Sequence, residues 1–356
     1  MPYCRRCGTK LDEDAHFCQK CGTPVATYTY ASPAPSTPMK PIRNDPVILA
    51  AIALSVLLVV GVVVVALLAA PLSTVNFGQT YQDNTVNVYK LNLNVETDGA
   101  KVNVFTQNVN NSNFIITLEG TGSKSTFGGG SDSPIQVTFY NDTVNCVLTV
   151  TAKITESTAF SRLNVDCNIY LNPALTLNLN VTSQAGQVSL TADKPATFEF
   201  LNLQATAGTV QANLQNVTVA GNVTLKTQAG TVDFRMSQIN IEGNNTVDLH
   251  SNAGTVTMDI TQTKTLHGNL QVKAATELGA VNVGLVIDGD VGAKIISQTN
   301  LGSINANPQH FSGNQSPIQS DNYPAASNIE INSRTNLGSI NINASYQSSV
   351  MPSVRN

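Results

Sequence analysis

The most regular feature of the chain is a pattern of apolar and polar positions that repeats around a glycine between residues 178 and 346. Apolar residues alternate with polar ones on both sides of each glycine, which is the period-two pattern of a half-buried strand. Two residues after every one of these glycines stands a β-branched Val or Ile. The seven repeat-turn glycines are Gly186, Gly208, Gly230, Gly254, Gly279, Gly302 and Gly338.

The spacing of these glycines predicts a β-solenoid, in which each repeat is one coil stacked on its neighbours. Successive glycines are 22 to 25 residues apart, except that the last interval, of 36 residues, carries an insertion. The apolar phase slips by one residue across each glycine, so the chain must turn or bulge there, and glycine permits this through a positive φ. Ser or Thr stands three residues before six of the seven glycines. We expect these hydroxyl groups to stack from coil to coil.

Three segments depart from the regular repeat: the region before it, an insertion in its last interval and the tail after it. Residues 72–177 alternate without the glycine register and predict divergent β structure leading into the array. The insertion in the last interval contains His310, Phe311 and Tyr323 and is a candidate recognition loop, although a tolerated surface loop is the simpler explanation. The sequence leaves open whether the coil at Gly338 is capped by the tail, residues 347–356, or by another molecule.

A different pattern occupies residues 47–70, which form an apolar run without a charge. As a helix it would extend about 36 Å, enough to cross a hydrocarbon core of about 30 Å, so we expect a transmembrane α-helix. Residues 26–46 contain five prolines among Thr, Ser and Ala and predict a semi-rigid linker. Lys40 and Arg43 stand just before the run, which predicts a cytoplasmic N-terminus and an extracellular segment 72–356. A cleaved signal peptide is the weaker alternative because the run is too long.

Four of the six cysteines form two Cys-x-x-Cys pairs near the N-terminus, each followed by glycine: Cys4, Cys7, Cys18 and Cys21. Two such turns supply the four thiolates of a closed zinc site, and the metal then supplies most of the folding free energy of residues 1–25. Two disulfides are the alternative, but they fit a cytosolic segment poorly. Because a closed site leaves no open position for a substrate, we expect a structural zinc ion without a catalytic role.

The remaining cysteines, Cys146 and Cys167, occupy the apolar phases of two alternating runs. They lie at equal distance from a turn near Glu156 and Ser157, so a hairpin there would place them opposite one another. In an oxidising exterior we expect a disulfide between them, and two buried free thiols are the alternative.

Composition narrows the set of partners. Charged residues make up 12% of the chain and the formal net charge is −4. So low a share of charged residues favours strands whose outer faces carry hydroxyl and amide groups over helices whose surfaces are covered with ion pairs. Near the N-terminus the basic residues are offset by acidic ones, so no basic stripe remains and we expect no nucleic-acid partner.

Two parts of the chain resemble known families. The start, MPYCRRCGTKLDEDAHFCQKCGTPV, resembles the short N-terminal zinc ribbons that precede membrane segments in many archaeal and some bacterial proteins. This resemblance implies zinc ligation by the four cysteines. The repeats QAGQV, TAGTV, QAGTV, NAGTV, ELGAV and NLGSI resemble those of the putative-adhesin β-solenoid family. That resemblance implies a non-catalytic surface module and offers no catalytic residue to carry over.

These features predict a mainly β, single-pass protein of the cell membrane that is not an enzyme. Its expected role is surface adhesion or scaffolding through a glycan or protein ligand that the sequence does not identify. One alternative is a transmembrane sensor that relays ligand binding or clustering outside to an unknown cytoplasmic partner of the zinc ribbon. A carbohydrate-active β-helix enzyme is a further alternative. It is disfavoured because Asp288 and Asp290 flank a glycine and predict a turn rather than a pair of catalytic carboxylates.

Overall fold

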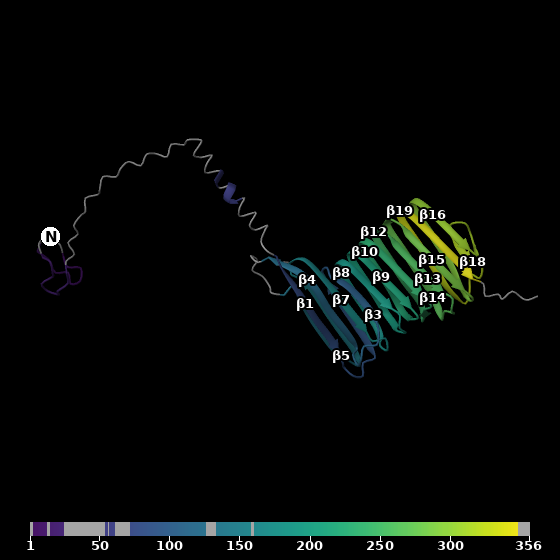
Figure 1. The fold of residues 1–356 in the computed structure, drawn as a ribbon, viewed down its shortest axis with the longest axis horizontal. Helices are drawn as coiled ribbons and strands as arrows, with labels where there is room; N and C mark the ends of the chain where they lie inside the picture. Colours follow the sequence, from purple (N-terminus) through teal and green to yellow (C-terminus); the bar gives the residue numbers. More distant parts are fainter. Residues whose placement is uncertain are drawn as a thin grey trace, which may run out of the picture. The chain divides into compact units, whose positions relative to one another are not determined.

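The computed structural model describes residues 3–12, 15–24, 54–55, 57–60, 72–125, 133–157 and 160–347. The chain divides into two compact units, Met1–Ala69 and Ala70–Asn356. The second unit is built of β-strands (Figure 1). They are β1 (Leu72–Asp83), β2 (Lys90–Thr97), β3 (Lys101–Thr106), β4 (Phe114–Ser125), β5 (Ile135–Val144), β6 (Val147–Glu156), β7 (Phe160–Leu171), β8 (Thr176–Ala192), β9 (Thr197–Gln215), β10 (Thr218–Ser237), β11 (Asn240–Ile241), β12 (Gly243–Ala253), β13 (Val256–Gln262), β14 (Gly268–Leu278), β15 (Val281–Asp288), β16 (Val291–Gln309), β17 (Phe311–Ser312), β18 (Ile318–Ser320) and β19 (Ser327–Gln347).

Successive repeats pair in parallel with equivalent residues opposite one another. Gly208 lies opposite Gly186 in β8 and opposite Gly230 in β10. The halves before the glycine form one ladder, in which β10 pairs with β12, and the halves after it form a second ladder, in which β10 pairs with β13. The inward side chains of both ladders belong to one continuous hydrophobic core. The alternation of apolar and polar residues therefore fixes which side of each strand is buried.

The glycine prediction is confirmed, since all seven repeat-turn glycines have a positive φ between 112° and 153°. Steric contact adds a second reason for glycine at this corner. A Cβ atom on Gly208 would lie 1.9 Å from the carbonyl oxygen of Gly186, and one on Gly254 would lie 1.9 Å from that of Gly230. Any side chain would push neighbouring coils apart, so the close stacking of the coils requires glycine.

The hydroxyl groups three residues before the glycines lie opposite one another as expected, and all of them except that of Ser183 donate to the carbonyl of a neighbouring corner glycine. Ser251 Oγ donates a hydrogen bond to the Gly230 carbonyl at 3.0 Å, and Thr276 Oγ1 donates one to the Gly254 carbonyl at 3.2 Å. The hydroxyl of Thr335 does the same toward Gly279 at 3.2 Å. These side chains are buried. Their hydroxyl groups therefore satisfy carbonyl oxygens that the turn removes from water.

The order of the coils in space differs from their order along the chain at the C-terminal end. The coil of Gly338, in β19, lies between β14 and β15 on one side and β16 on the other. The coil of Gly302, in β16, is therefore the outermost one, and Gly338 does not mark the final coil. Pro308 gives a physical reason, because proline in a sheet is confined to edge strands and β16 is the strand that carries it.

At the other end of the stack, too, the order of the strands in space differs from their order along the chain. Strands β2 and β3 pair with β8, although β6 and β7 are nearer to β8 in the sequence. Strand β6 pairs with β2, and β7 pairs with β3, so these two strands form the outer coil. Antiparallel strands then continue both ladders, with β5 beside β6, β4 beside β7 and β1 beside β4.

The predicted disulfide between Cys146 and Cys167 is wrong, because the hairpin that would align them does not form. Strands β6 and β7 belong to different ladders and do not pair with each other. Cys146 is exposed in the turn after β5, whereas Cys167 is buried in β7, and both thiols are free. Burial raises the pKa of the Cys167 thiol to about 12.

Much of the segment between the two units lies outside the described residues. This applies to the predicted linker, residues 26–46, and to most of the predicted membrane helix, residues 47–70. Residues 348–356 of the tail lie outside them as well. Within the part of the chain that is described, no helix is both long and apolar enough to cross a membrane.

The corner contact predicts a large difference between two glycine substitutions. We expect Gly254→Ala to lower the free energy of unfolding by about 4 kcal/mol, because its Cβ would overlap the Gly230 carbonyl. Gly243 also has a positive φ, of 81°, but a Cβ there meets nothing within 4 Å. Gly243→Asn should therefore cost less than about 1 kcal/mol. Urea unfolding of both variants measures this difference, and equal losses would show that coil contact does not decide the choice of glycine.

The positions of the two cysteines outside the zinc ribbon predict unequal reactivity toward alkylating reagents. We expect iodoacetamide to modify Cys146 in the folded protein and to leave Cys167 unmodified, because the thiolate is the reactive form and burial suppresses it. Peptide mass spectrometry before and after denaturation measures both rates. Equal modification of the two thiols in the folded state, or a disulfide-linked peptide, would contradict the structure.

Candidate functional site

The four N-terminal cysteines come together as the sequence predicts. Their Sγ atoms all lie within 4.8 Å of one another, with Cys4 and Cys21 3.5 Å apart and Cys7 and Cys18 3.6 Å apart. Four sulfurs at about 2.3 Å from a tetrahedral zinc ion lie about 3.8 Å from one another. Both the distances and the soft thiolate donors fit zinc. His16 is exposed and does not belong to this group of four.

Each Cys-x-x-Cys pair lies in a tight turn, and the two turns are built alike. The Gly8 amide donates to the Cys4 carbonyl at 2.9 Å, and the Gly22 amide donates to the Cys18 carbonyl at 2.8 Å. Both glycines have a positive φ, of 67° and 71°. These turns place two thiolates of each pair on the same side of the backbone, where they can reach one ion.

Two threonines support the sulfur atoms, and the sequence analysis did not identify them. The Thr9 hydroxyl lies 3.2 Å from Cys7 Sγ, and the Thr23 hydroxyl lies 3.2 Å from Cys21 Sγ. The hydrogen bond from Thr23 lowers the pKa of Cys21 to about 6, and that from Thr9 lowers the pKa of Cys7. The signal that could have revealed them is the sequence Cys-Gly-Thr, which ends both turns.

The candidate recognition loop is tied to the end of the stack. Phe311 is half-buried and packs against the core. The Tyr323 hydroxyl donates to Glu330 at 2.7 Å, and the Lys294 ammonium lies 5.9 Å from the centre of its ring. His310 is exposed and lies 4.0 Å from Asp321. The two aromatic residues thus contribute to packing, and neither is a freely projecting anchor.

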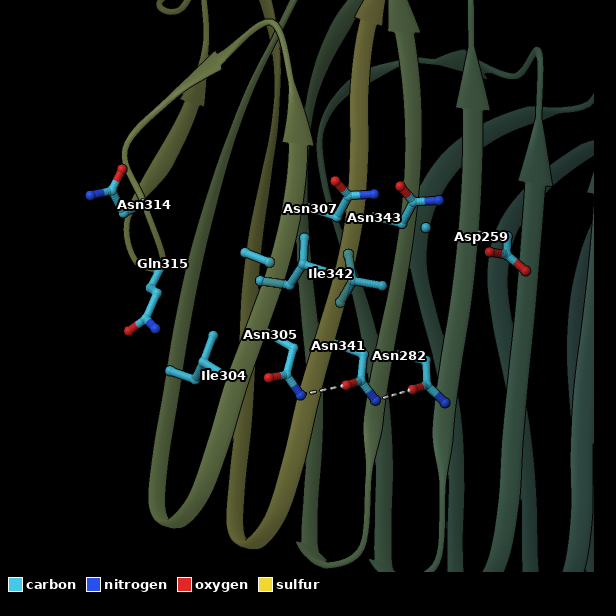
Figure 2. Close-up of a pocket in the computed structure, with 13 residues that line it drawn as sticks. Asp259, Asn282, Ile304, Asn305, Asn307, Asn314, Gln315, Asn341, Ile342 and Asn343 are labelled. Atoms are coloured by element: carbon cyan, nitrogen blue, oxygen red, sulfur yellow. Dashed lines mark hydrogen bonds between the residues drawn. The ribbon is translucent and has the colours of Figure 1, made fainter.

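A hollow with a volume of about 690 Å³ lies beside β16. Figure 2 shows amide side chains in a row across neighbouring strands, with the loop of Asn314 and Gln315 on the other side of β16. Asn305 Nδ2 donates to Asn341 Oδ1 at 3.1 Å, and Asn341 Nδ2 donates to Asn282 Oδ1 at 2.9 Å. Most of the residues that line the hollow carry neutral amide side chains, which offer both donors and acceptors to a polar partner.

Comparisons with known proteins identify the N-terminal module. Residues 3–25 match the model of the zinc-ribbon domain. Together with the geometry of the four thiols, this match makes Cys4, Cys7, Cys18 and Cys21 the ligands of a structural zinc ion. No curated protein matches the chain.

Some solved structures are similar to the β-rich part at low sequence identity. A putative cell adhesion protein from Clostridium sporogenes is 14% identical, with 77% of this chain and all of that chain covered and a TM-score of 0.33. A putative adhesin from Bacteroides fragilis is also 14% identical, with 76% and 98% covered and a TM-score of 0.30. A putative adhesin from Parabacteroides distasonis is 11% identical, with 77% and 98% covered and a TM-score of 0.24.

The threonine contacts predict a measurable effect on zinc binding. Thr23→Val removes the hydrogen bond to Cys21 and raises the pKa of its thiol, so protons compete better with the metal. We expect zinc affinity at neutral pH to fall by about tenfold and zinc release to occur at a higher pH than in the wild-type protein. Competition with a chromophoric chelator over a pH series measures both. Thr23→Ser keeps the hydroxyl and is the control, and equal losses in both variants would contradict this role.

Proposed function

We propose that the protein is a single-pass membrane protein whose β-rich unit is a β-solenoid that acts outside the cell by binding, in adhesion or scaffolding, without catalysis. The zinc ribbon then lies in the cytoplasm. The apolar run 47–70 supports the membrane span, and Lys40 and Arg43 before it support the orientation. The parallel register of equivalent residues supports the description of the repeats as solenoid coils.

The observation that carries this proposal is the set of side-chain rows on the outer faces of the stack. Because equivalent residues lie opposite one another, asparagines at the same repeat position bond from coil to coil. Asn178 donates to Asn92 at 2.9 Å, and Asn202 donates to Asn180 at 2.6 Å. Such rows form a long, rigid and mostly neutral wall, which suits recognition by shape and hydrogen bonding.

The charged side chains on the outer faces support binding over catalysis. Asp248 pairs with Lys226 at 2.7 Å, and Asp233 accepts a hydrogen bond from Arg235 at 3.2 Å. These are exposed or half-exposed pairs on the wall, which are ordinary features of a solvated surface. A hydrolase of carbohydrates would instead need two carboxylates held apart across a sugar-binding cleft.

A sensor that signals through the zinc ribbon is the second candidate, and one feature of the ribbon favours it. Tyr3 and Phe17 precede the first cysteine of each turn and are 63% and 62% exposed. Two exposed aromatic side chains on so small a module are suited to contact another protein. In this version, clustering of the β-rich units outside the cell changes how much of a cytoplasmic partner is bound to the zinc ribbon.

Protease protection on intact cells tests the proposed topology. One epitope tag precedes Cys4 and another follows Asn356. We expect external protease to remove the C-terminal tag and to leave the N-terminal tag intact, with permeabilised cells as the control in which both are cleaved. Loss of the N-terminal tag with survival of the C-terminal one would place the β-rich unit in the cytoplasm and overturn the adhesion proposal.

A further inference from the structure

We propose that the outermost coil, β16, is an interface through which two copies of this chain pair edge to edge. The two copies of the segment Leu301–Gln309 would lie antiparallel across a two-fold axis. This inference deepens the proposed function, on which its biological meaning rests, because it names the partner as a second copy of the protein.

The first observation is an open strand edge. Strand β16 pairs with β19 along its whole length, whereas on its other side the described pairing is confined to Lys294 and Ile295, which face β18. In the described structure, Leu301–Gln309 therefore presents one row of backbone N–H and C=O groups without a strand partner. Such an edge is a template for pairing with another chain. The segment contains no charged residue to prevent this, and Pro308 removes only one donor.

The second observation is incomplete burial of side chains that are fully covered elsewhere. Ile304 and Ala306 are half-buried, whereas Ile340 and Ile342, which lie opposite them on β19, are 0% and 3% exposed. These two inward positions of β16 thus have a neighbouring strand on one side only, whereas the inner coils have one on both sides. A further strand beside β16 would cover these two side chains and gain the hydrophobic contribution that inner coils already have.

A third observation is an exposed row of leucines at the corner of the last three coils. Leu337 lies opposite Leu278 on one side and Leu301 on the other. Their exposed fractions are 51% for Leu278, 45% for Leu337 and 68% for Leu301. In the four coils before them the same corner position is alanine. The apolar surface therefore increases toward the open end, which is typical of a contact surface.

The amide rows also end at this coil with unused acceptors. Asn305 donates to Asn341, and Asn300 donates to Asn336 at 3.2 Å, so both rows run in the same direction. The side-chain oxygens of Asn300 and Asn305 are left at the outer end of their rows. A strand that carries amide or hydroxyl donors would continue both rows, and β16 of a second copy carries such groups itself. The hollow of about 690 Å³ beside this edge is lined by Asn305 and by Asn314 and Gln315 of the loop that follows β17 (Figure 2).

Symmetry and position favour a second copy as the occupant. The edge is neutral, so two copies do not repel one another, and a two-fold contact uses both open edges and closes at a dimer. Strand β1, which follows the predicted membrane span, and strand β16 lie at opposite ends of the stack (Figure 1). Pairing through β16 therefore leaves β1, the strand that follows the predicted span, away from the contact.

Analytical ultracentrifugation of the detergent-solubilised full chain tests this pairing. We expect a reversible dimer whose dissociation constant rises by about tenfold or more in Asn305→Lys, because like charges would then face each other at the edge. Gln211→Lys places the same charge at the same repeat position of an inner coil and should leave the dimer unchanged. Ala306→Pro is a second edge variant, and it removes a donor on the same side of β16 as Pro308. Circular dichroism checks that each variant is folded.

Several results would overturn the proposal. A full chain that stays monomeric, or a dimer that is insensitive to both edge variants, would exclude β16 as the interface. A dimer that forms only after deletion of residues 348–356 would show that the chain's own tail covers the edge. Because the measurement is made in detergent, it does not depend on topology, so a failed protease-protection test and a failed dimer test are distinguishable.

Discussion

The β-rich unit depends on how closely neighbouring coils approach at the glycine corner. A carbonyl oxygen of one coil occupies the space where a Cβ of the next coil would stand, as the contact between Gly254 and Gly230 illustrates. The buried hydroxyl group three residues earlier in the next coil then donates to that oxygen, as Ser251 does toward Gly230. Steric fit and hydrogen bonding thus act on the same atom. Together they hold the coils in one register, and the register aligns the side chains of the outer faces.

The same stacking leaves unpaired backbone groups at its two ends, because the outermost strand of each ladder has no further coil beside it. At one end antiparallel strands continue the ladders, with β5 and β4 beside the outer coil and β1 beyond β4. At the other end the cover is short, since β18 pairs with only two residues of β16. This asymmetry makes the C-terminal end the chemically distinctive part of the unit. Open backbone, half-buried core residues and the ends of the amide rows all meet there.

The zinc ribbon follows a different principle of stability. It has a small core of its own, in which Leu11 packs with the cysteines, so the four thiolates and their metal must supply most of its folding free energy. Hydrogen bonds from Thr9 and Thr23 favour the thiolate forms that bind the metal. The ribbon and the β-rich strands belong to separate compact units.

The sequence by itself determined the zinc ligands, the glycine corners and the inward face of every regular strand, because each depends on residues close together in the chain or on a strict period. Tertiary structure alone decided which strands are neighbours. Period-two alternation says which side of a strand is buried but not what lies beside it. Strand β19 occupies an inner position, and β16, which carries Pro308, lies at the edge. The alternation around Cys146 and Cys167 is compatible with a hairpin, but it does not specify which strands pair. In the structure β6 pairs with β2 and β7 pairs with β3, so the two cysteines do not lie opposite one another.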